Sequence, residues 1–119
     1  MHSEYGIIDE KTALKINQCK KKGGKIIAVG TTTLRLLESA AKNNVVEKFN
    51  TETNIFIKPG YKFQIVDMLL TNFHLPKSTL LLLVSAFAGT EEIFKIYKHA
   101  VTNKYRFFSY GDVSLLFKK

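Results

Sequence analysis

Five polar side chains lie close together in the sequence, immediately before a strongly apolar run. They are Thr71, Asn72, His74, Lys77 and Ser78. A histidine has a pKa near working pH, so it can act there as an acid, a base or a hydrogen-bond donor. A lone histidine can equally be a packed side chain bonded to a backbone carbonyl. The polar neighbours favour a lined pocket at this position.

A second candidate site is the sequence VGTTT at residues 29–33, at the junction of a predicted strand and a predicted helix. Free backbone N–H groups and the helix dipole attract anions at such a junction, and ligands of α/β proteins bind at the carboxyl ends of strands. The pattern is neither GxGxxG nor GxxxxGK[ST]. A plain capped turn and a ligand loop therefore stay equal alternatives.

Three further features carry weaker chemical signals. Asp67 and Asp112 stand beside apolar residues at predicted strand ends, where burial raises a carboxyl pKa, although a cap or an ion pair is the commoner role. Residues 105–110 interleave aromatic side chains with an arginine, which can stack on bases and contact phosphate or can form the edge of a core. Three scattered histidines and one cysteine match no zinc spacing, so no metal is expected.

Hydrophobic periodicity predicts the elements that position these residues. Helices are predicted over 9–22, 31–42, about 76–88 and 90–104. Strands are predicted over 26–29, 54–58 and 113–117, with one or two more between 61 and 73, and 43–53 is predicted to be a loop. Thr31 or Thr32 is expected to cap the second helix and Thr90 the fourth.

Two of the predicted elements call for burial on every side. Strand 26–29 is uniformly apolar, and helix 76–88 is apolar nearly all round. The element order indicates an α/β fold, with a small and mostly buried sheet flanked by helices. One domain of 119 residues has little material to cover both elements, so the chain is expected to be part of a larger protein.

The composition is strongly basic. The chain has 18 Lys plus Arg against 10 Asp plus Glu, a formal net charge of +8. Such an excess favours a nucleic-acid partner, with a solvated lysine-rich surface as the alternative. The lone Cys19 cannot form an internal disulfide, no signal peptide is recognisable, and the apolar run 80–88 is too short to cross a bilayer. A cytoplasmic location without membrane attachment is expected.

Several sequence blocks together resemble one enzyme family. The blocks are MHSEY at the start, IIAVGTTTLRLLES at 26–39, NIFIKPGYKF at 54–63, VDMLLTNFHLPKSTLLLLVSAFAG at 66–89 and KYRFFSYGD at 104–112. In this order they closely resemble the S-adenosylmethionine:tRNA ribosyltransferase-isomerases of queuosine biosynthesis. The resemblance covers nearly the whole chain.

The resemblance implies a fold context and a reaction. Residues 1–119 would be the C-terminal part of the α/β domain of a larger two-domain enzyme, without its N-terminal portion and inserted β-rich domain. Such enzymes use S-adenosylmethionine as a ribosyl donor. They transfer the ribosyl group to 7-aminomethyl-7-deazaguanine at the wobble position of tRNA and rearrange it, giving epoxyqueuosine and releasing adenine and methionine.

The resemblance also suggests roles for individual residues. His74 is expected to transfer a proton or donate a hydrogen bond, with Asp67 and Asp112 as further catalytic candidates. The residues expected to bind substrate are Thr31, Thr32, Arg35, Thr71, Asn72 and Ser78. The residues expected to contact tRNA are Lys77, Tyr105 and Arg106.

Three hypotheses about the chain follow. It is an enzyme part that needs a separate N-terminal chain of the same enzyme, a basic tRNA-binding module without catalysis, or the non-functional remnant of a truncated gene. Release of adenine from S-adenosylmethionine, with and without the missing portion, distinguishes the first hypothesis from the others.

Overall fold

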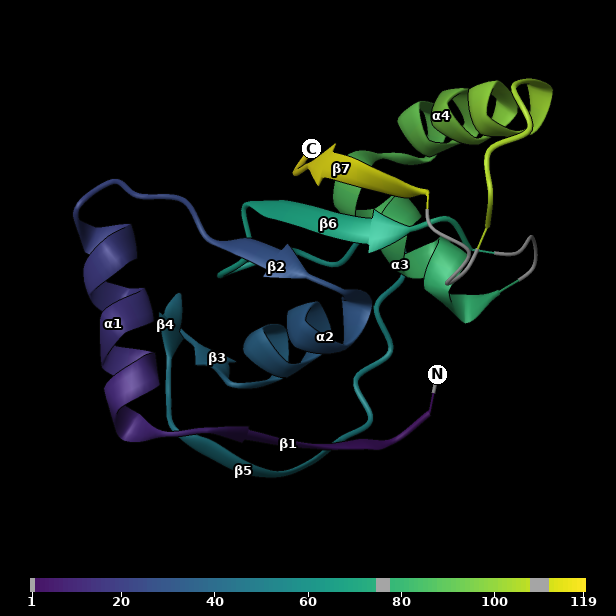
Figure 1. The fold of residues 1–119 in the computed structure, drawn as a ribbon. Coiled ribbons are helices and arrows are strands. Elements are labelled where there is room, and N and C mark those ends of the chain that lie inside the picture. Colours follow the sequence, from purple (N-terminus) through teal and green to yellow (C-terminus); the bar gives the residue numbers. More distant parts are fainter. Residues whose placement is uncertain (1, 75–77, 108–111) are drawn as a thin grey trace.

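The computed structural model describes residues 2–74, 78–107 and 112–119 (Figure 1). It has an α/β fold, as predicted. Its elements in chain order are β1 (Glu4–Ile8), α1 (Glu10–Lys21), β2 (Ile27–Val29), α2 (Thr31–Ser39), β3 (Ala41–Lys42), β4 (Val45–Val46), β5 (Phe49–Thr53), β6 (Met68–Asn72), α3 (Thr79–Ala88), α4 (Thr90–Thr102) and β7 (Val113–Phe117).

A three-stranded sheet forms the centre of the molecule. β6 lies in the middle, parallel to β2 and antiparallel to β7. The register places Ala28, Leu69 and Leu116 side by side, and all three are buried. Because side chains alternate along a strand, this row defines one face of the sheet.

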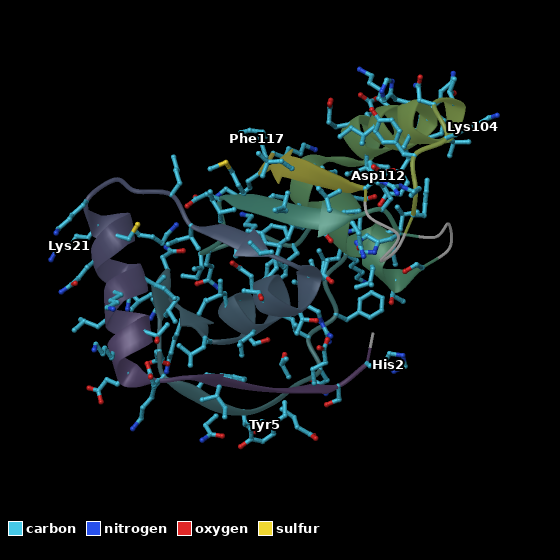
Figure 2. All side chains as sticks on the ribbon, viewed as in Figure 1. His2, Tyr5, Lys21, Lys104, Asp112 and Phe117 are labelled. Carbon is cyan, nitrogen blue, oxygen red and sulfur yellow. The ribbon has the colours of Figure 1, made fainter. Side chains whose placement is uncertain are left out.

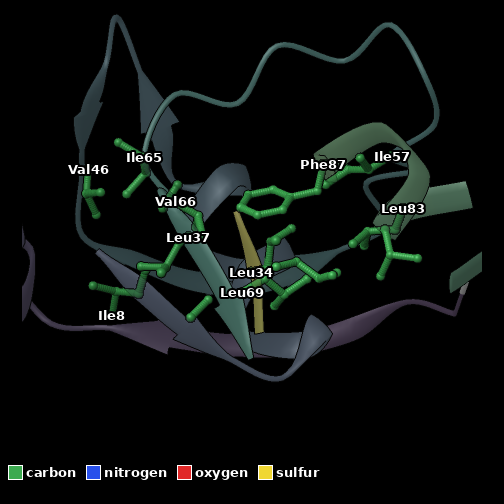
Figure 3. Packing of buried hydrophobic residues seen from close by; sticks show 14 of the residues in the cluster. Ile8, Leu34, Leu37, Val46, Ile57, Ile65, Val66, Leu69, Leu83 and Phe87 are labelled. Carbon is green, nitrogen blue, oxygen red and sulfur yellow. The ribbon is translucent and has the colours of Figure 1, made fainter. Parts of the chain in front are cut away.

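The core lies against this face of the sheet. α2 contributes Leu34 and Leu37, and α3 contributes Leu83 and Phe87, which surround Leu69 in the same cluster (Figure 3). These side chains are 7% exposed or less. Both helices therefore bury an apolar stripe on one side of the sheet, as expected of an α/β layer.

Two antiparallel ribbons complete the fold. β1 pairs with β5 along the side of the molecule away from β7 (Figure 1), and β3 pairs with β4. The β3–β4 hairpin turns at Asn43 and Asn44, whose φ angles of 53° and 64° suit a type I′ turn. The predictions of a helix to residue 42 and a loop over 43–53 were wrong. α2 ends at Ser39, and the asparagine pair allows strands on both sides of it.

Other predictions also needed correction. Residues 54–58 form no strand, although Ile57 is buried. α3 begins at Thr79, and its Leu82 is 41% exposed, so this helix is not buried on every side. The N-caps of α2 and α4 are Gly30 and Gly89, not threonines. Pro76, predicted to lie in the first turn of α3, falls outside the described residues.

The prediction for β2 was wrong about its burial. Ala28 is fully buried, but Ile27 and Val29 are 52% and 65% exposed. The strand is apolar, as predicted, but within the described part of the chain nothing covers the face that carries Ile27 and Val29. Among the described residues, the helices are too short or too polar to cross a lipid bilayer.

Candidate functional site

The carboxyl ends of β2 and β6 meet at one edge of the sheet. Because the two strands are parallel, the segment after β2 and the last residues of β6 lie together there. They form a depression of about 340 Å³, lined by Val29, Gly30, Thr31, Thr32, Leu70, Thr71, Asn72 and Val113. Four predicted substrate-binding residues, Thr31, Thr32, Thr71 and Asn72, are therefore brought together.

Gly30 forms the turn from β2 into α2. Its N–H donates to the Leu70 carbonyl at 2.8 Å, which extends the pairing with β6, and its φ of +92° is one that glycine adopts without strain. Among the described residues, no side chain caps α2. The first residues of this turn, Thr31 and Thr32, line the depression, and the free backbone N–H groups of a helix N-terminus favour an anionic group.

His74 lies behind the depression and contacts it through Thr71. The two side chains are 3% and 5% exposed, and His74 Nε2 lies 3.3 Å from Thr71 Oγ1. The His74 backbone N–H donates to the Tyr97 hydroxyl at 2.9 Å. Burial lowers the pKa of His74 below its ordinary value of 6.5, so the ring is neutral near pH 7. A neutral imidazole can accept from, or donate to, the threonine hydroxyl.

Aromatic rings enclose the segment that carries His74. Phe73 packs against Tyr97, Tyr105 and Phe107, with ring centroids 5.3, 5.8 and 5.4 Å apart. Phe73 is 2% exposed, whereas Tyr105 is 40% exposed. Phe73, the neighbour of His74 in the sequence, is thus held within an aromatic cluster. Chemical reasoning from the sequence missed Phe73 and Tyr97, because both look like ordinary members of apolar stripes.

Asp112 and Arg106 lie at the same end of the sheet. Val113 pairs with Asn72, which places Asp112 near the carboxyl end of β6. Asp112 accepts from the Arg106 backbone N–H and pairs with its guanidinium at 3.4 Å. The backbone N–H bond, assisted by the Arg106 charge, lowers the Asp112 pKa. Asp112 is therefore an ionised partner of Arg106, whose side chain is 67% exposed.

Asp67 lies at the opposite end of β6. β6 spans the five residues after Asp67, roughly 16 Å at ~3.3 Å per residue. Its carboxylate accepts from the Ile26 N–H at 2.8 Å and pairs with Lys20 at 3.3 Å. Burial alone would raise the Asp67 pKa, but the Ile26 N–H, Lys20 and Lys118 outweigh burial and lower it. The structure brings Asp67 neither to the depression nor to His74.

Two other predicted substrate-binding residues have internal partners. Arg35 is 2% exposed and donates to Glu4 Oε1 at 2.6 Å and to the carbonyls of His2 and Ile55 at 2.8 and 3.0 Å. The Ser78 hydroxyl accepts from the Leu80 N–H and caps α3. Neither lines the depression. Lys77, predicted to contact tRNA, falls outside the described residues.

Glu38 is a buried carboxylate that sequence reasoning missed. It is 3% exposed and accepts from the backbone N–H groups of Gln64, Ile65 and Val66 at 2.8, 2.9 and 3.0 Å. The Tyr61 hydroxyl donates to the same carboxylate at 3.1 Å. Burial first, and then this carboxylate, raises the Tyr61 pKa. Glu38 thus fixes the segment that leads into β6.

Comparisons with known proteins identify the family. The model of a family described as queuosine biosynthesis protein matches residues 1–116. The chain belongs to this family. Curated relatives named S-adenosylmethionine:tRNA ribosyltransferase-isomerase are 60% identical in Rickettsia typhi and 58% identical in Zymomonas mobilis. Each alignment covers all of this chain but only 32% and 35% of the relative.

A solved structure of the same family has the same fold over the shared region. The crystal structure of the S-adenosylmethionine tRNA ribosyltransferase from Thermotoga maritima aligns with a TM-score of 0.87 at 45% identity. The alignment covers 93% of this chain and 39% of that one. The family resemblance deduced from the motifs is confirmed. The chain spans about a third of the length of the curated relatives it matches.

Among the residues that the structure describes, no group of three or more His, Cys, Asp or Glu side chains is placed to hold a metal ion. The polar groups of the depression are hydroxyls, an amide and backbone N–H groups. They are suited to hydrogen-bonding a polar organic molecule with an anionic end.

Proposed function

We propose that this chain forms part of the active site of a tRNA ribosyltransferase-isomerase of queuosine biosynthesis. In the proposed reaction, the ribosyl group of S-adenosylmethionine is transferred to 7-aminomethyl-7-deazaguanine in tRNA and isomerised to give epoxyqueuosine. The catalytic unit is this chain together with the portion that its longer relatives carry. The chain alone is expected to be inactive.

The observation that carries the proposal is the depression at the ends of β2 and β6. The family acts on a substrate with a carboxylate, two ribose hydroxyls and a sulfonium. The uncapped first turn of α2 suits the carboxylate, while Thr31, Thr32 and Asn72 offer hydrogen bonds to hydroxyls. At about 340 Å³ and open to one side, the depression is at the small end of ligand sites, which is consistent with a missing wall.

In this proposal Thr71 contacts the substrate and His74 positions Thr71. The His74 ring lies behind the threonine rather than on the lining of the depression. Its lowered pKa keeps it neutral. Its Nε2 can accept a hydrogen bond from the Thr71 hydroxyl, which leaves the hydroxyl lone pairs for the substrate, or it can donate one, which leaves the hydroxyl proton for the substrate. The catalytic role assigned to His74 on sequence grounds is thus refined to an indirect one.

Reconstitution of activity tests the proposal. This chain is mixed with the part of the Rickettsia typhi relative that it does not span, S-adenosylmethionine and tRNA carrying 7-aminomethyl-7-deazaguanine, and adenine release is measured. We expect release only when both polypeptides are present. Release by this chain alone, or no release from a mixture in which both polypeptides are folded and bound to each other, would contradict the proposal.

A matched pair of threonine variants tests the site itself. Thr71 and Thr53 are 5% and 6% exposed, and both hydroxyls are hydrogen-bonded, but only Thr71 lines the depression. Thr71→Val is expected to lower the rate about tenfold, the value of one hydrogen bond of ~1.4 kcal/mol. Thr53→Val should keep the rate of adenine release while losing at least as much stability, because its hydroxyl also accepts from the Ile55 N–H at 3.2 Å. Equal rates of adenine release for the two variants would show that Thr71 does not contact the substrate.

The basic charge favours a second candidate function, tRNA binding without catalysis. The net charge is +8, and Arg106 and Tyr105 lie exposed near the carboxyl end of the sheet. Such a module would bind tRNA in a strongly salt-dependent way and release no adenine even with the missing portion present. Failure of the purified chain to fold would instead favour a non-functional remnant.

A further inference from the structure

One face of the central sheet is apolar and open. We call it the open face and define it by Ile27, Val29, Val113, Leu115 and Phe117. These side chains are 52%, 65%, 56%, 49% and 63% exposed. The register puts Ile27 and Phe117 in one row on either side of Met68, and Val29 and Leu115 in the next row on either side of Leu70. The exposed residues therefore form one contiguous surface rather than scattered positions.

Physical principles call for a cover over this surface. All-parallel sheets occur almost only with both faces covered by helices, and many α/β folds add an antiparallel edge strand to such a sheet. β2 and β6 are parallel, yet α2 and α3 contribute to the core on only one face. β2 is also an edge strand, since among the described residues it pairs with β6 alone. An apolar face beside an unpaired edge is a surface that proteins normally cover.

The open face adjoins the candidate site. Val29 and Val113 belong to the open face and also line the depression, together with Leu70 and Asn72 from the same side of β6. A polypeptide that packs on the open face therefore also reaches the open side of the depression. Covering this surface and completing the site would be one event.

We infer that the open face binds the portion of the family's enzyme that this chain does not span, through an apolar helix packed across β2, β6 and β7. The relatives that match along the whole of this chain are about three times as long, so they contain ample polypeptide for such a cover. A helix is the element that normally covers a parallel sheet. This inference relies on the proposed function only for the choice of partner.

Binding is measured between this chain and the unspanned part of the Rickettsia typhi relative, without tRNA or S-adenosylmethionine. The two polypeptides are coexpressed, purified through a tag on this chain, and their affinity is measured after separation and remixing. Phe117→Lys is the test variant because it places a charge on the open face. Ile7→Lys is the control, since Ile7 and Phe117 are both 63% exposed. Ile7 lies on β1 with Tyr5, which is on the other side of the molecule from Phe117 in Figure 2.

We expect Phe117→Lys to weaken binding about 30-fold or more, as for a central interface residue, and Ile7→Lys to change it less than about threefold. Both variants should melt like the wild type, because neither side chain is in the core. Equal effects of the two variants, or no copurification of the partner with the wild-type chain, would overturn the inference. So would a dimer of this chain that Phe117→Lys dissolves and the partner does not displace, since the occupant would then be a second copy.

The result is separable from the test of activity. Binding that depends on Phe117 but gives no adenine release would support the docking surface and contradict the proposed function. Adenine release by a mixture in which Phe117→Lys has no effect on binding would support the function and overturn the docking surface.

Discussion

The buried carboxylate of Glu38 offers the sharpest test of how this fold is held together. It accepts four hydrogen bonds, three from consecutive backbone N–H groups and one from the Tyr61 hydroxyl. Glu38→Gln keeps the shape but replaces one acceptor oxygen with an NH₂ group. Oε1 receives Tyr61 and Gln64, while Oε2 receives Ile65 and Val66. An NH₂ group at the Oε2 position loses two bonds and opposes two backbone donors, whereas at the Oε1 position it loses the Gln64 bond, because only the Tyr61 hydroxyl can rotate to accept.

A hydrogen bond to a charged group contributes ~1.5–3 kcal/mol, and a buried donor without a partner costs ~1–3 kcal/mol. Because these terms are not additive, we expect Glu38→Gln to lower the free energy of unfolding by about 3 kcal/mol. Tyr61→Phe removes one of the four bonds and should cost about 1.5 kcal/mol, the low end of this range, because Tyr61 is only partly buried. Urea unfolding followed by circular dichroism measures both values. If the free energy of unfolding of Glu38→Gln lies within about 0.5 kcal/mol of the wild-type value, the hydrogen bonds to Glu38 do not hold residues 61–66 in place.

Three further predictions concern stability. Burial holds the His74 pKa below 6.5, so the unfolded state binds the proton more readily, and stability is lost as pH falls below about 6.5. The urea midpoint should therefore drop between pH 7.5 and 5.5, and it should drop less in His74→Gln. Identical drops in the two proteins would refute this. Arg35→Lys loses the planar guanidinium that bonds two carbonyls and should lower the free energy of unfolding by about 2–4 kcal/mol. Glu4→Gln, at a side chain about one-third exposed, should lower it by about 1 kcal/mol or less. The reverse order in chemical unfolding would refute this. Asn17→Ala removes two hydrogen bonds, both to the backbone of Val46, and should lower the free energy of unfolding by about 1–2 kcal/mol. Thermal unfolding measures this as a lower midpoint, and an unchanged midpoint would contradict it.

The sequence predicted the elements whose pattern is local. α1, α4 and β7 have a regular apolar period, and β7 lies at residues 113–117 as predicted. Elements whose pattern depends on distant partners were missed. β1 and β5 are half-exposed strands whose pairing joins residues about 45 positions apart. Neither strand shows a strong alternation of apolar and polar residues on its own. Residues 54–58 have strand composition but pack as irregular chain, because no neighbouring strand pairs with them in the described part of the chain.

Part of the candidate site was predictable for the same reason. Thr31, Thr32, Thr71 and Asn72 lie at strand ends, and parallel pairing brings such ends together, so their proximity follows from topology. The separation of Asp67 from His74 does not follow from composition. The two residues flank β6 at opposite ends, and this depends on where the strand begins and ends in the folded chain. The internal partners of Arg35 could not be foreseen either, since they come from the N-terminal segment and from Ile55.

α2 connects the two ends of the sheet and so links stability to the site. Its first turn follows Gly30 at the depression, while Glu38, in its last turn, fixes the residues that lead into β6. Any shift of β6 along β2 would break the Gly30–Leu70 bond at one end or the Glu38 bonds at the other. The helix therefore fixes where Thr71 and Asn72 stand relative to Thr31 and Thr32. This positioning uses only residues of this chain. In the proposed assembly, the partner therefore needs only to cover the open face and close the depression.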